Sequence, residues 1–363
     1  MENFWPMPSL YLKLSTVSSA PPVSPQARVS IVIPTRNRSK ALHNCLDSLV
    51  RQTYTDFEVI VVDGGSTDHT VEVVQEAKRK LRIELVTMRG GLVPKMNEGL
   101  CRARGEFFVR VDDDVVTEPD WLDAVVATFD ESALVGGVTG PTIIPKGRGS
   151  FRDLFLFQEK FLRGSIFWRA VGVIYYRYFL EGDPFAIGRW FRSGAFSLGS
   201  NYVASTKLAG AQEVDHHEAC NMAVRTELLR KVGGFDPVYT GLGEFHEPDM
   251  SFKIRRMGFK ILFEPRAVVF HDVSGGGYLM DRPNSYGRII NFLNFYFKHI
   301  RTDKMSNTVR LTSYLLFMDM YWLYGFLRTK QASQLGGIRG TIAGLAKNSL
   351  RRPSLRDPAR GHR

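Results

Sequence analysis

Three carboxylates stand side by side at Asp112, Asp113 and Asp114, directly after the mostly apolar run Glu106–Val111. Adjacent carboxylates repel one another, so a fold that gathers them needs either a compensating cation or a solvated turn. Mg²⁺ or Mn²⁺ would compensate the charge, because hard divalent ions take oxygen ligands and share them with phosphate and water. In an extended segment Asp112 and Asp114 point to the same side and could both reach one metal ion. The alternative is an exposed acidic turn that binds nothing.

A second acidic group, made of Glu244, Glu247 and Asp249, begins a segment with helical periodicity. A carboxylate in a pocket can act as a general base. Carboxylates also stabilise helix N-termini, which offers a purely structural role for Glu247 and Asp249. Both interpretations stay open, and we rank Glu247 first, Asp249 second and Glu244 third as a base.

Alternating strand and helix patterns must position these groups. The β-branched run Val29–Ile33, closed by Pro34, predicts a buried strand. Apolar residues from Leu42 to Val50 then recur at helical spacing after Ser39, which can cap the helix. Further strands are predicted at 57–62, 81–86, 106–111 and 267–270, with helices after residue 70 and at 94–103. This order indicates an α/β fold with a Rossmann-like, mainly parallel sheet and helices on both faces.

The carboxyl ends of parallel strands meet at one edge of such a sheet, and ligands bind there. In this sequence the residues at those ends are the basic loop Pro34–Arg38, Asp63 with Gly64, and the acidic triplet. One basic loop and two acidic loops should therefore converge.

The composition is that of a globular protein of 363 residues, with a net charge of +11 and 12% aromatic residues. A basic, aromatic-rich surface suits a polyanion or anionic lipid headgroups. The three separated cysteines favour a reducing compartment, and no stretch reaches the roughly 18 apolar residues of a membrane span. The changing character of the chain divides it into a flexible leader (1–27), an α/β segment (28–140), an inserted aromatic and basic lobe (141–212), a second regular segment (213–285), C-terminal helices (286–350) and a basic disordered tail (351–363).

Five segments carry the motifs of a known family, and in chain order they are VSIVIPTRNR (Val29–Arg38), FEVIVVDGGSTDHT (Phe57–Thr70), EFFVRVDDDV (Glu106–Val115), VGGFDP (Val232–Pro237) and FEPRAVVFH (Phe263–His271). Over residues 28–272 the chain resembles the family 2 glycosyltransferases of the GT-A fold. The resemblance implies transfer of a sugar from a nucleotide-diphosphate donor to an acceptor hydroxyl, usually with inversion at the anomeric carbon. It assigns donor binding to 28–140, and acceptor binding and catalysis to 213–285.

The resemblance also implies roles for single residues. Those expected at the nucleotide sugar are Pro34, Thr35, Arg36, Asp63, Lys95, Asn97, Asp112 and Asp113. Asp112 and Asp114 match the DxD motif, whose last Asp commonly binds the metal, while the first addresses ribose or a metal-bound water. Two positions depart from the family pattern. Met96 replaces a usual arginine, with Lys95 beside it to supply the charge, and Gly64 replaces a second acid, which leaves the donor's base undetermined.

An inverting transfer needs a base for the proton of the attacking hydroxyl. The resemblance places Glu247 at the catalytic acid of the family's ED-x-D-L element and Asp249 at its later Asp, with His246 in front of Glu247. His271 closes a strand where some relatives use histidine as a further metal ligand. The expected ligands of Mg²⁺ or Mn²⁺ are thus Asp112, Asp114 and His271, and the metal would offset the charge that grows on the departing diphosphate.

Arginines and aromatic rings are interleaved in the lobe and in the C-terminal helices. Examples are Arg169 with Trp168 and Tyr175, and Phe292 with Tyr296. Such mixtures suit the headgroup zone of a bilayer. They predict an enzyme that is cytoplasmic, or peripheral on the cytoplasmic face of an anionic membrane, acting on a glycan, a lipid-linked or a protein acceptor. A homodimer face or a second core explains the same residues equally well.

Two other classes fit less well. A sugar nucleotidyltransferase would carry a glycine-rich loop after the first strand, whereas Pro34–Arg38 contains no glycine. A nucleic-acid-binding protein would explain the net charge, but the acidic loops would repel phosphates. We therefore expect no nucleic-acid partner.

Overall fold

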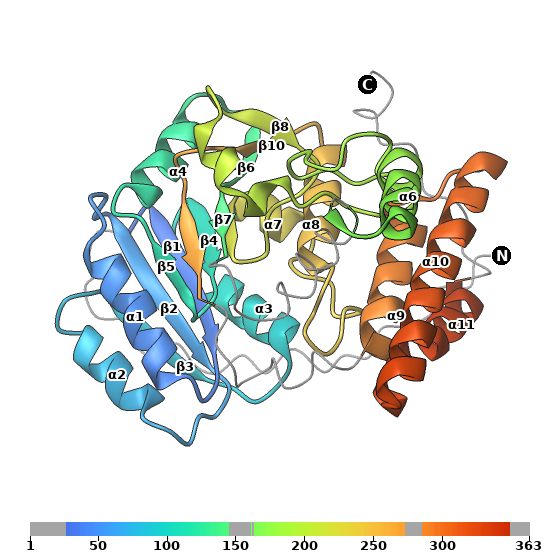
Figure 1. Cartoon of the computed structure of the whole chain (residues 1–363). Helices are drawn as coiled ribbons and strands as arrows, with labels where there is room; N and C mark the ends of the chain where they lie inside the picture. The colour runs from blue at the N-terminus through green and yellow to red at the C-terminus, as the bar shows by residue number, and fades with distance from the viewer. Residues whose placement is uncertain (1–26, 145–160, 162, 273–284, 349–363) are drawn as a thin grey trace, which may run out of the picture.

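The structure is a computed structural model that describes residues 27–144, 161, 163–272 and 285–348 (Figure 1). The predicted tail at 351–363 lies outside the described residues, as does all of the predicted leader except Ala27.

An eight-stranded sheet forms the centre, in the order β3-β2-β1-β4-β9-β6-β10-β8. Its strands are β1 (Val29–Thr35), β2 (Phe57–Asp63), β3 (Ile83–Thr87), β4 (Phe107–Val111), β6 (Val135–Thr139), β8 (Gln212–Val214), β9 (Asn221–Arg225) and β10 (Lys260–Phe263). β1 pairs in parallel with β2 and β4, and β2 with β3, while β9 runs antiparallel between β4 and β6. The predicted mainly parallel α/β sheet is confirmed, and Thr35 lies opposite Asp63 at its carboxyl edge.

Strand β1 shows why these runs form buried strands. Ile31 and Ile33 enter one core and Val32 enters another, so both faces of the strand are covered. The first core is closed by α1 (Ser39–Val50), α2 (Thr70–Ala77) and α4 (Trp121–Asp130). The second is closed by α3 (Leu92–Arg102), α7 (Thr226–Lys231) and α8 (His246–Arg256). The predicted helices on both faces are therefore present.

A small second sheet brings distant residues to the acidic triplet. It consists of β5 (Val115–Thr117), β11 (Val269–His271) and β7 (Thr142–Ile143), with β11 in the middle. His271 pairs with Val115, and the Asp272 N–H donates to the Asp114 carbonyl over 2.9 Å. His271 therefore lies beside Asp114 because of strand pairing.

A helical layer covers one side of the α/β unit (Figure 1). It contains α6 (Ile166–Ile174), the π-helical turn η1 (Tyr175–Phe179), α9 (Ser285–Phe295), the π-helical turn η5 (Tyr296–Ile300), α10 (Met305–Thr329), the 3-10 turn η6 (Ala332–Leu335) and α11 (Gly336–Asn348). Two further 3-10 turns, η2 (Gly199–Asn201) and η3 (Val203–Lys207), follow the lobe's first helices. Within the described ranges, no helix combines the length and apolar character that a membrane span requires.

Some of the aromatic rings predicted at a bilayer instead form a core. Phe292 and Tyr296 are buried, and the Phe292 ring lies 5.8 Å from the Phe245 ring at the start of α8. The Tyr175 ring likewise packs 5.5 Å from that of Phe317 in α10. These rings join the lobe, α8 and the C-terminal helices, so they agree with the second-core alternative and do not face lipid.

Candidate active site

The acidic triplet does not have the extended conformation that the sequence suggests. Asp112 to Val115 form a turn in which the Val115 N–H donates to the Asp112 carbonyl over 3.2 Å. Asp113 and Asp114 are only 3% and 4% exposed, so the alternative of a solvated acidic turn is also wrong. The turn points Asp113 and Asp114 into the protein and leaves Asp112 partly exposed.

Arg38 neutralises the two buried members of the triplet. Its guanidinium Nη1 donates to Asp113 Oδ1 at 2.7 Å and to Asp114 Oδ2 at 3.0 Å. The Thr35 hydroxyl donates to the other oxygen of Asp113 at 2.8 Å. Burial raises the pKa of Asp113 to about 7, although Arg38 acts in the opposite direction. Asp113, expected at the nucleotide sugar, thus holds the loop after β1 against the turn after β4.

Arg110 neutralises the third member and connects it to α8. This buried side chain donates to Asp112 Oδ1 at 2.9 Å and to Glu247 Oε1 at 2.6 Å. Burial alone would lower the pKa of Arg110, but Asp112 and Glu247 raise it above its ordinary value. Arg38 and Arg110 therefore supply compensating charge from within the protein, and the predicted divalent cation would add to it.

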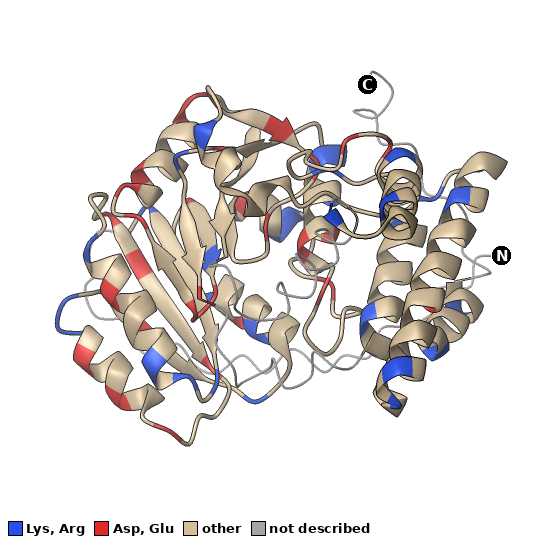
Figure 2. Ribbon diagram, in the orientation of Figure 1, with Lys and Arg blue, Asp and Glu red and all other residues tan. Residues whose placement is uncertain are grey.

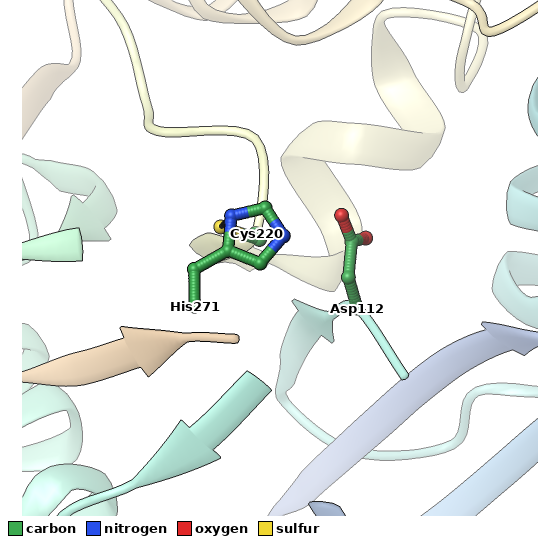
Figure 3. A group of neighbouring side chains, drawn as sticks. All are labelled: Asp112, Cys220 and His271. Carbon is green, nitrogen blue, oxygen red and sulfur yellow. Dashed lines mark hydrogen bonds between the residues drawn. The ribbon is translucent and has the colours of Figure 1, made fainter. Parts of the chain in front are cut away.

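A candidate metal site lies beside the turn. Asp112, Cys220 and His271 each offer a ligand atom, and these atoms lie within 4.8 Å of one another (Figure 3). His271 Nε2 is 3.1 Å from Asp114 Oδ1, and its Nδ1 is 3.7 Å from Cys220 Sγ. The donors are carboxylate oxygens and an imidazole, with a thiol beside them. This set fits a divalent transition ion better than Mg²⁺, which prefers oxygen alone.

Glu247 lies in the first turn of α8 and is 5% exposed. Its Oε1 accepts from Arg110, while Oε2 lies 3.3 Å from Nδ1 of His246. That nitrogen is also 2.5 Å from the Gly243 carbonyl, so it carries the proton and donates to Gly243. Burial would raise the pKa of Glu247, but His246 and Arg110 hold it below its ordinary value. Glu247 is therefore ionised at neutral pH, as a base must be.

The backbone before Glu247 is held in an unusual conformation. Phe245, the residue before α8, has a φ of 75°, which is unfavourable for a residue with a large side chain. Its ring packs with those of Phe292 in α9 and Trp190 in the lobe. The aromatic core therefore stabilises the bend that presents Glu247.

Asp249, the second candidate base, has a different environment. Its carboxylate contacts Lys253, Lys298 and His299 over 2.6 to 2.8 Å and accepts from the Tyr239 hydroxyl at 3.0 Å. Burial opposes ionisation, yet these partners lower the pKa of Asp249 well below its ordinary value. The carboxylate joins α8 to η5 and is a weak proton acceptor.

Of the remaining residues predicted at the donor, Arg36 is exposed, whereas Pro34, Asp63 and Lys95 are buried. Buried Pro34 is part of β1, Arg36 is exposed beyond it, and the buried Asp63 accepts from the Ser66 N–H over about 3.0 Å. Lys95 is fully buried, and burial lowers its pKa to about 8 against the pull of Asp63.

Asn97 has a structural contact. Its amide exchanges two hydrogen bonds, 2.8 and 2.9 Å long, with the backbone of Phe235. The adjacent Gly234 has a φ of 70°, and a Cβ there would lie 2.7 Å from Asn97 Oδ1. Asn97 therefore fixes the VGGFDP loop to α3.

Four residues of this site escaped the sequence analysis as functional candidates: Arg38, Arg110, His246 and Cys220. The sequence offered one signal for such a residue, which is Arg110 inside the otherwise apolar strand 106–111. A charge buried in a strand requires charged or polar partners nearby. Cys220 and His271 are 51 residues apart, so their proximity has no local signature.

Comparisons with known proteins show what the chain resembles in sequence and in fold. Residues 30–192 match the family described as Glycosyl transferase family 2. A curated relative, the PGL/p-HBAD biosynthesis glycosyltransferase of Mycobacterium bovis, is 36% identical over 149 residues, which cover 39% of this chain and 58% of the relative. The chain thus spans less than two thirds of the length of that relative.

Two solved structures have a similar fold. TarS 1-349 of S. aureus in complex with UDP-GlcNAc has a TM-score of 0.58 and 18% identity, over 88% of this chain and 81% of that one. The mannosyltransferase PcManGT from Pyrobaculum calidifontis, in complex with GDP-Man and Mn²⁺, has a TM-score of 0.52 and 20% identity, over 90% and 88%. The predicted GT-A fold is confirmed.

Proposed function

We propose that this chain is a family 2 glycosyltransferase, which transfers a sugar from a nucleotide-diphosphate donor to an acceptor hydroxyl with inversion at the anomeric carbon. The match of residues 30–192 to that family and the curated glycosyltransferase that is 36% identical over 149 residues support this proposal. The observation that carries this proposal is the Arg110 bridge. It joins Asp112, on the donor side, to Glu247, a buried and ionised carboxylate. The presence of nucleotide sugars in the two similar structures supports the class of donor.

On the donor side we propose that Asp112, Asp114 and His271 hold a divalent cation, with Cys220 at its edge. The donor set favours Mn²⁺ over Mg²⁺. When bound, the ion would offset the negative charge that grows on the leaving diphosphate. Thr35 and Arg38 keep the turn in place by holding Asp113, and Lys95 adds a positive charge close to Asp63.

On the acceptor side Glu247 is the proposed base. The acceptor oxygen forms a bond to the anomeric carbon as the bond from that carbon to the phosphate oxygen breaks. The proton of the hydroxyl goes to Oε2 of Glu247, because Oε1 is bound to Arg110. The nucleoside diphosphate leaves with the electron pair. Asp249 is a positioning residue in this scheme, since its carboxylate is occupied by the ammonium groups of Lys253 and Lys298 and by the His299 ring.

The class of acceptor is defined less narrowly than the class of donor. We propose a glycan, lipid-linked or protein hydroxyl in a glycosylation or cell-surface polysaccharide pathway, with the enzyme in the cytoplasm or at the cytoplasmic face of a membrane. A curated relative named for PGL/p-HBAD biosynthesis supports a biosynthetic role.

Slow hydrolysis of a panel of nucleotide sugars tests the proposal without knowledge of the acceptor. We expect one UDP- or GDP-sugar to be hydrolysed with Mn²⁺, and EDTA to abolish the reaction. Glu247→Gln should lower sugar transfer by about 10²–10⁴-fold while calorimetry still detects nucleotide binding. Asp114→Asn should weaken metal-dependent nucleotide binding itself. Normal turnover by Glu247→Gln would reject the assigned base, and nucleotide binding that ignores Mn²⁺ and Mg²⁺ would reject the metal site.

A further inference from the structure

Helix α10 carries an apolar stripe on its outer face. The stripe consists of Met305, Val309, Leu316, Met320, Leu323 and Leu327. These side chains follow one another at steps of three or four residues, except between Val309 and Leu316, where Thr312 takes the intermediate position. Met305 is 76% exposed, Leu316 59% and Met320 70%. At about 1.5 Å per residue the stripe runs along more than 30 Å of helix. The opposite face of α10 is buried through Leu311 and Leu315, so the stripe is not needed for the core.

Helices α6 and α11 extend the apolar face. Ile166 and Phe167 at the start of α6 are 85% and 65% exposed, and Ile342 in α11 is 66% exposed. The rings of Trp168 in α6 and Tyr324 in α10 lie 6.4 Å apart. Thr341 in α11 donates a 2.9 Å hydrogen bond to Asp319 in α10. The three helices therefore form one layer, seen at the right of Figure 1.

The exposed charges of α6, α10 and α11 are all positive. Its exposed charged residues within the three helices are Arg169, Arg328, Arg339 and Lys347. Asp319 is the acidic residue of these helices, and its carboxylate is engaged by Thr341. Figure 2 accordingly shows blue bands over α10 and α11 with little red.

We propose that the face made by α6, α10 and α11 docks onto the surface of an anionic lipid bilayer. Helices that lie on such a surface combine exposed apolar side chains with lysines and arginines, and each cation near anionic headgroups strengthens binding. A second copy of the chain would bring an equally positive face against this one, which disfavours a self-paired face. The helices lie on the bilayer and do not cross it, in agreement with the absence of a membrane-spanning helix among the described residues.

The docked layer is tied to the site by α9 and η5. Arg288 of α9 binds Glu244 just before α8, and Lys298 of η5 binds Asp249 within α8. If the proposed function holds, this connection would place the helix that carries Glu247 beside the membrane, where a lipid-linked acceptor resides. The bilayer docking itself does not depend on the reaction.

Flotation of the full chain with lipid vesicles tests the proposal. We expect binding to phosphatidylcholine vesicles that contain phosphatidylglycerol, little binding to phosphatidylcholine alone, and weakening as salt rises from about 0.05 to 0.5 M. Two variants should each lose binding by about tenfold or more. One is Leu316→Ser with Met320→Ser, and the other is Arg328→Glu with Arg339→Glu and Lys347→Glu.

Matched controls lie on the far side of the molecule. Leu134→Ser removes an equally exposed apolar side chain, and Lys78→Glu with Arg79→Glu and Lys80→Glu reverses three exposed cations after α2. Both controls should keep full binding, and thermal unfolding should show that all variants fold. The proposal is overturned if the full chain ignores anionic vesicles at low salt, or if controls and helix variants lose binding equally. A dimer in sedimentation analysis that the Leu316 variant dissociates, without vesicle binding, would identify a second copy as the occupant.

Discussion

Arg110 is the residue on which the proposed base, Glu247, and the proposed metal ligand Asp112 both depend. It is 2% exposed and has two acidic partners, so its replacement leaves Asp112 and Glu247 without a counter-charge. An arginine fork also fixes the orientation of both groups, which a lysine cannot do.

For this reason we expect Arg110→Lys to lower kcat by about a hundredfold. We also expect the acidic limb of the kcat/KM profile to move to higher pH. The limb should move to higher pH because Arg110 helps to hold the pKa of Glu247 below its ordinary value. A less well oriented lysine would let that pKa rise. Glu247 would then lose its proton-accepting form at a higher pH. Arg102→Lys, in an exposed pair with Glu98, is the control. An unshifted acidic limb in Arg110→Lys would show that Arg110 does not tune the base.

At the scale of elements, one carboxylate joins α8 to the C-terminal helices. Asp249 is 1% exposed at its side chain, whereas Lys253 and Lys298 are partly hydrated at 22% and 29%. Removal of the shared acid leaves the ammonium groups of Lys253 and Lys298 near each other without a counter-charge. The ion-pair cluster thereby links the position of Glu247, in the same helical turn, to the docked layer.

We expect Asp249→Asn to lower the free energy of unfolding by about 2–3 kcal/mol, below the cost for a fully buried pair because both lysines keep some hydration. Denaturant unfolding measures this change. Glu227→Gln, which breaks the exposed pair with Lys231, should cost close to nothing. At temperatures where Asp249→Asn is folded, its acidic pH limb should match that of the parent. A shifted limb would instead assign Asp249 to proton transfer.

For the whole molecule, buried His217 makes stability depend on pH. Its ring nitrogens lie 2.8 Å from Ser251 Oγ in α8 and 3.1 Å from the Ala223 carbonyl in β9. Burial lowers the pKa of His217 to about 3, below the ordinary value of 6.5. The unfolded chain therefore binds a proton that the folded chain refuses, in the window between these two values.

It follows that the free energy of unfolding should fall as the pH drops below 6.5, by up to about 1.4 kcal/mol per pH unit for this histidine. Denaturant titrations between pH 7 and pH 4 measure the slope. His217→Gln should flatten it, whereas His43→Gln, at an exposed position of α1, should not. Equal slopes in all three proteins would show that His217 titrates normally in the fold.

Local patterns in the sequence determined the order of strands and helices and the loops that meet at the sheet edge. Val29–Ile33, Asp63 and the acidic triplet have such patterns, because neighbours in the chain decide strand periodicity and turn formation. The sequence did not predict the backbone conformation of Asp112–Asp114, where a turn forms in place of the expected extended segment.

Only the tertiary structure decided which charges meet. Arg110 and Glu247 are 137 residues apart, and Arg38 lies 75 residues from Asp113, so no local rule joins them. The sequence already ranks Glu247 above Asp249 as a base, and the tertiary structure adds the physical reason, since η5 returns to α8 and engages Asp249 alone. Partners of a buried charge come from whichever strands and helices pack around it, and that packing is a property of the folded chain.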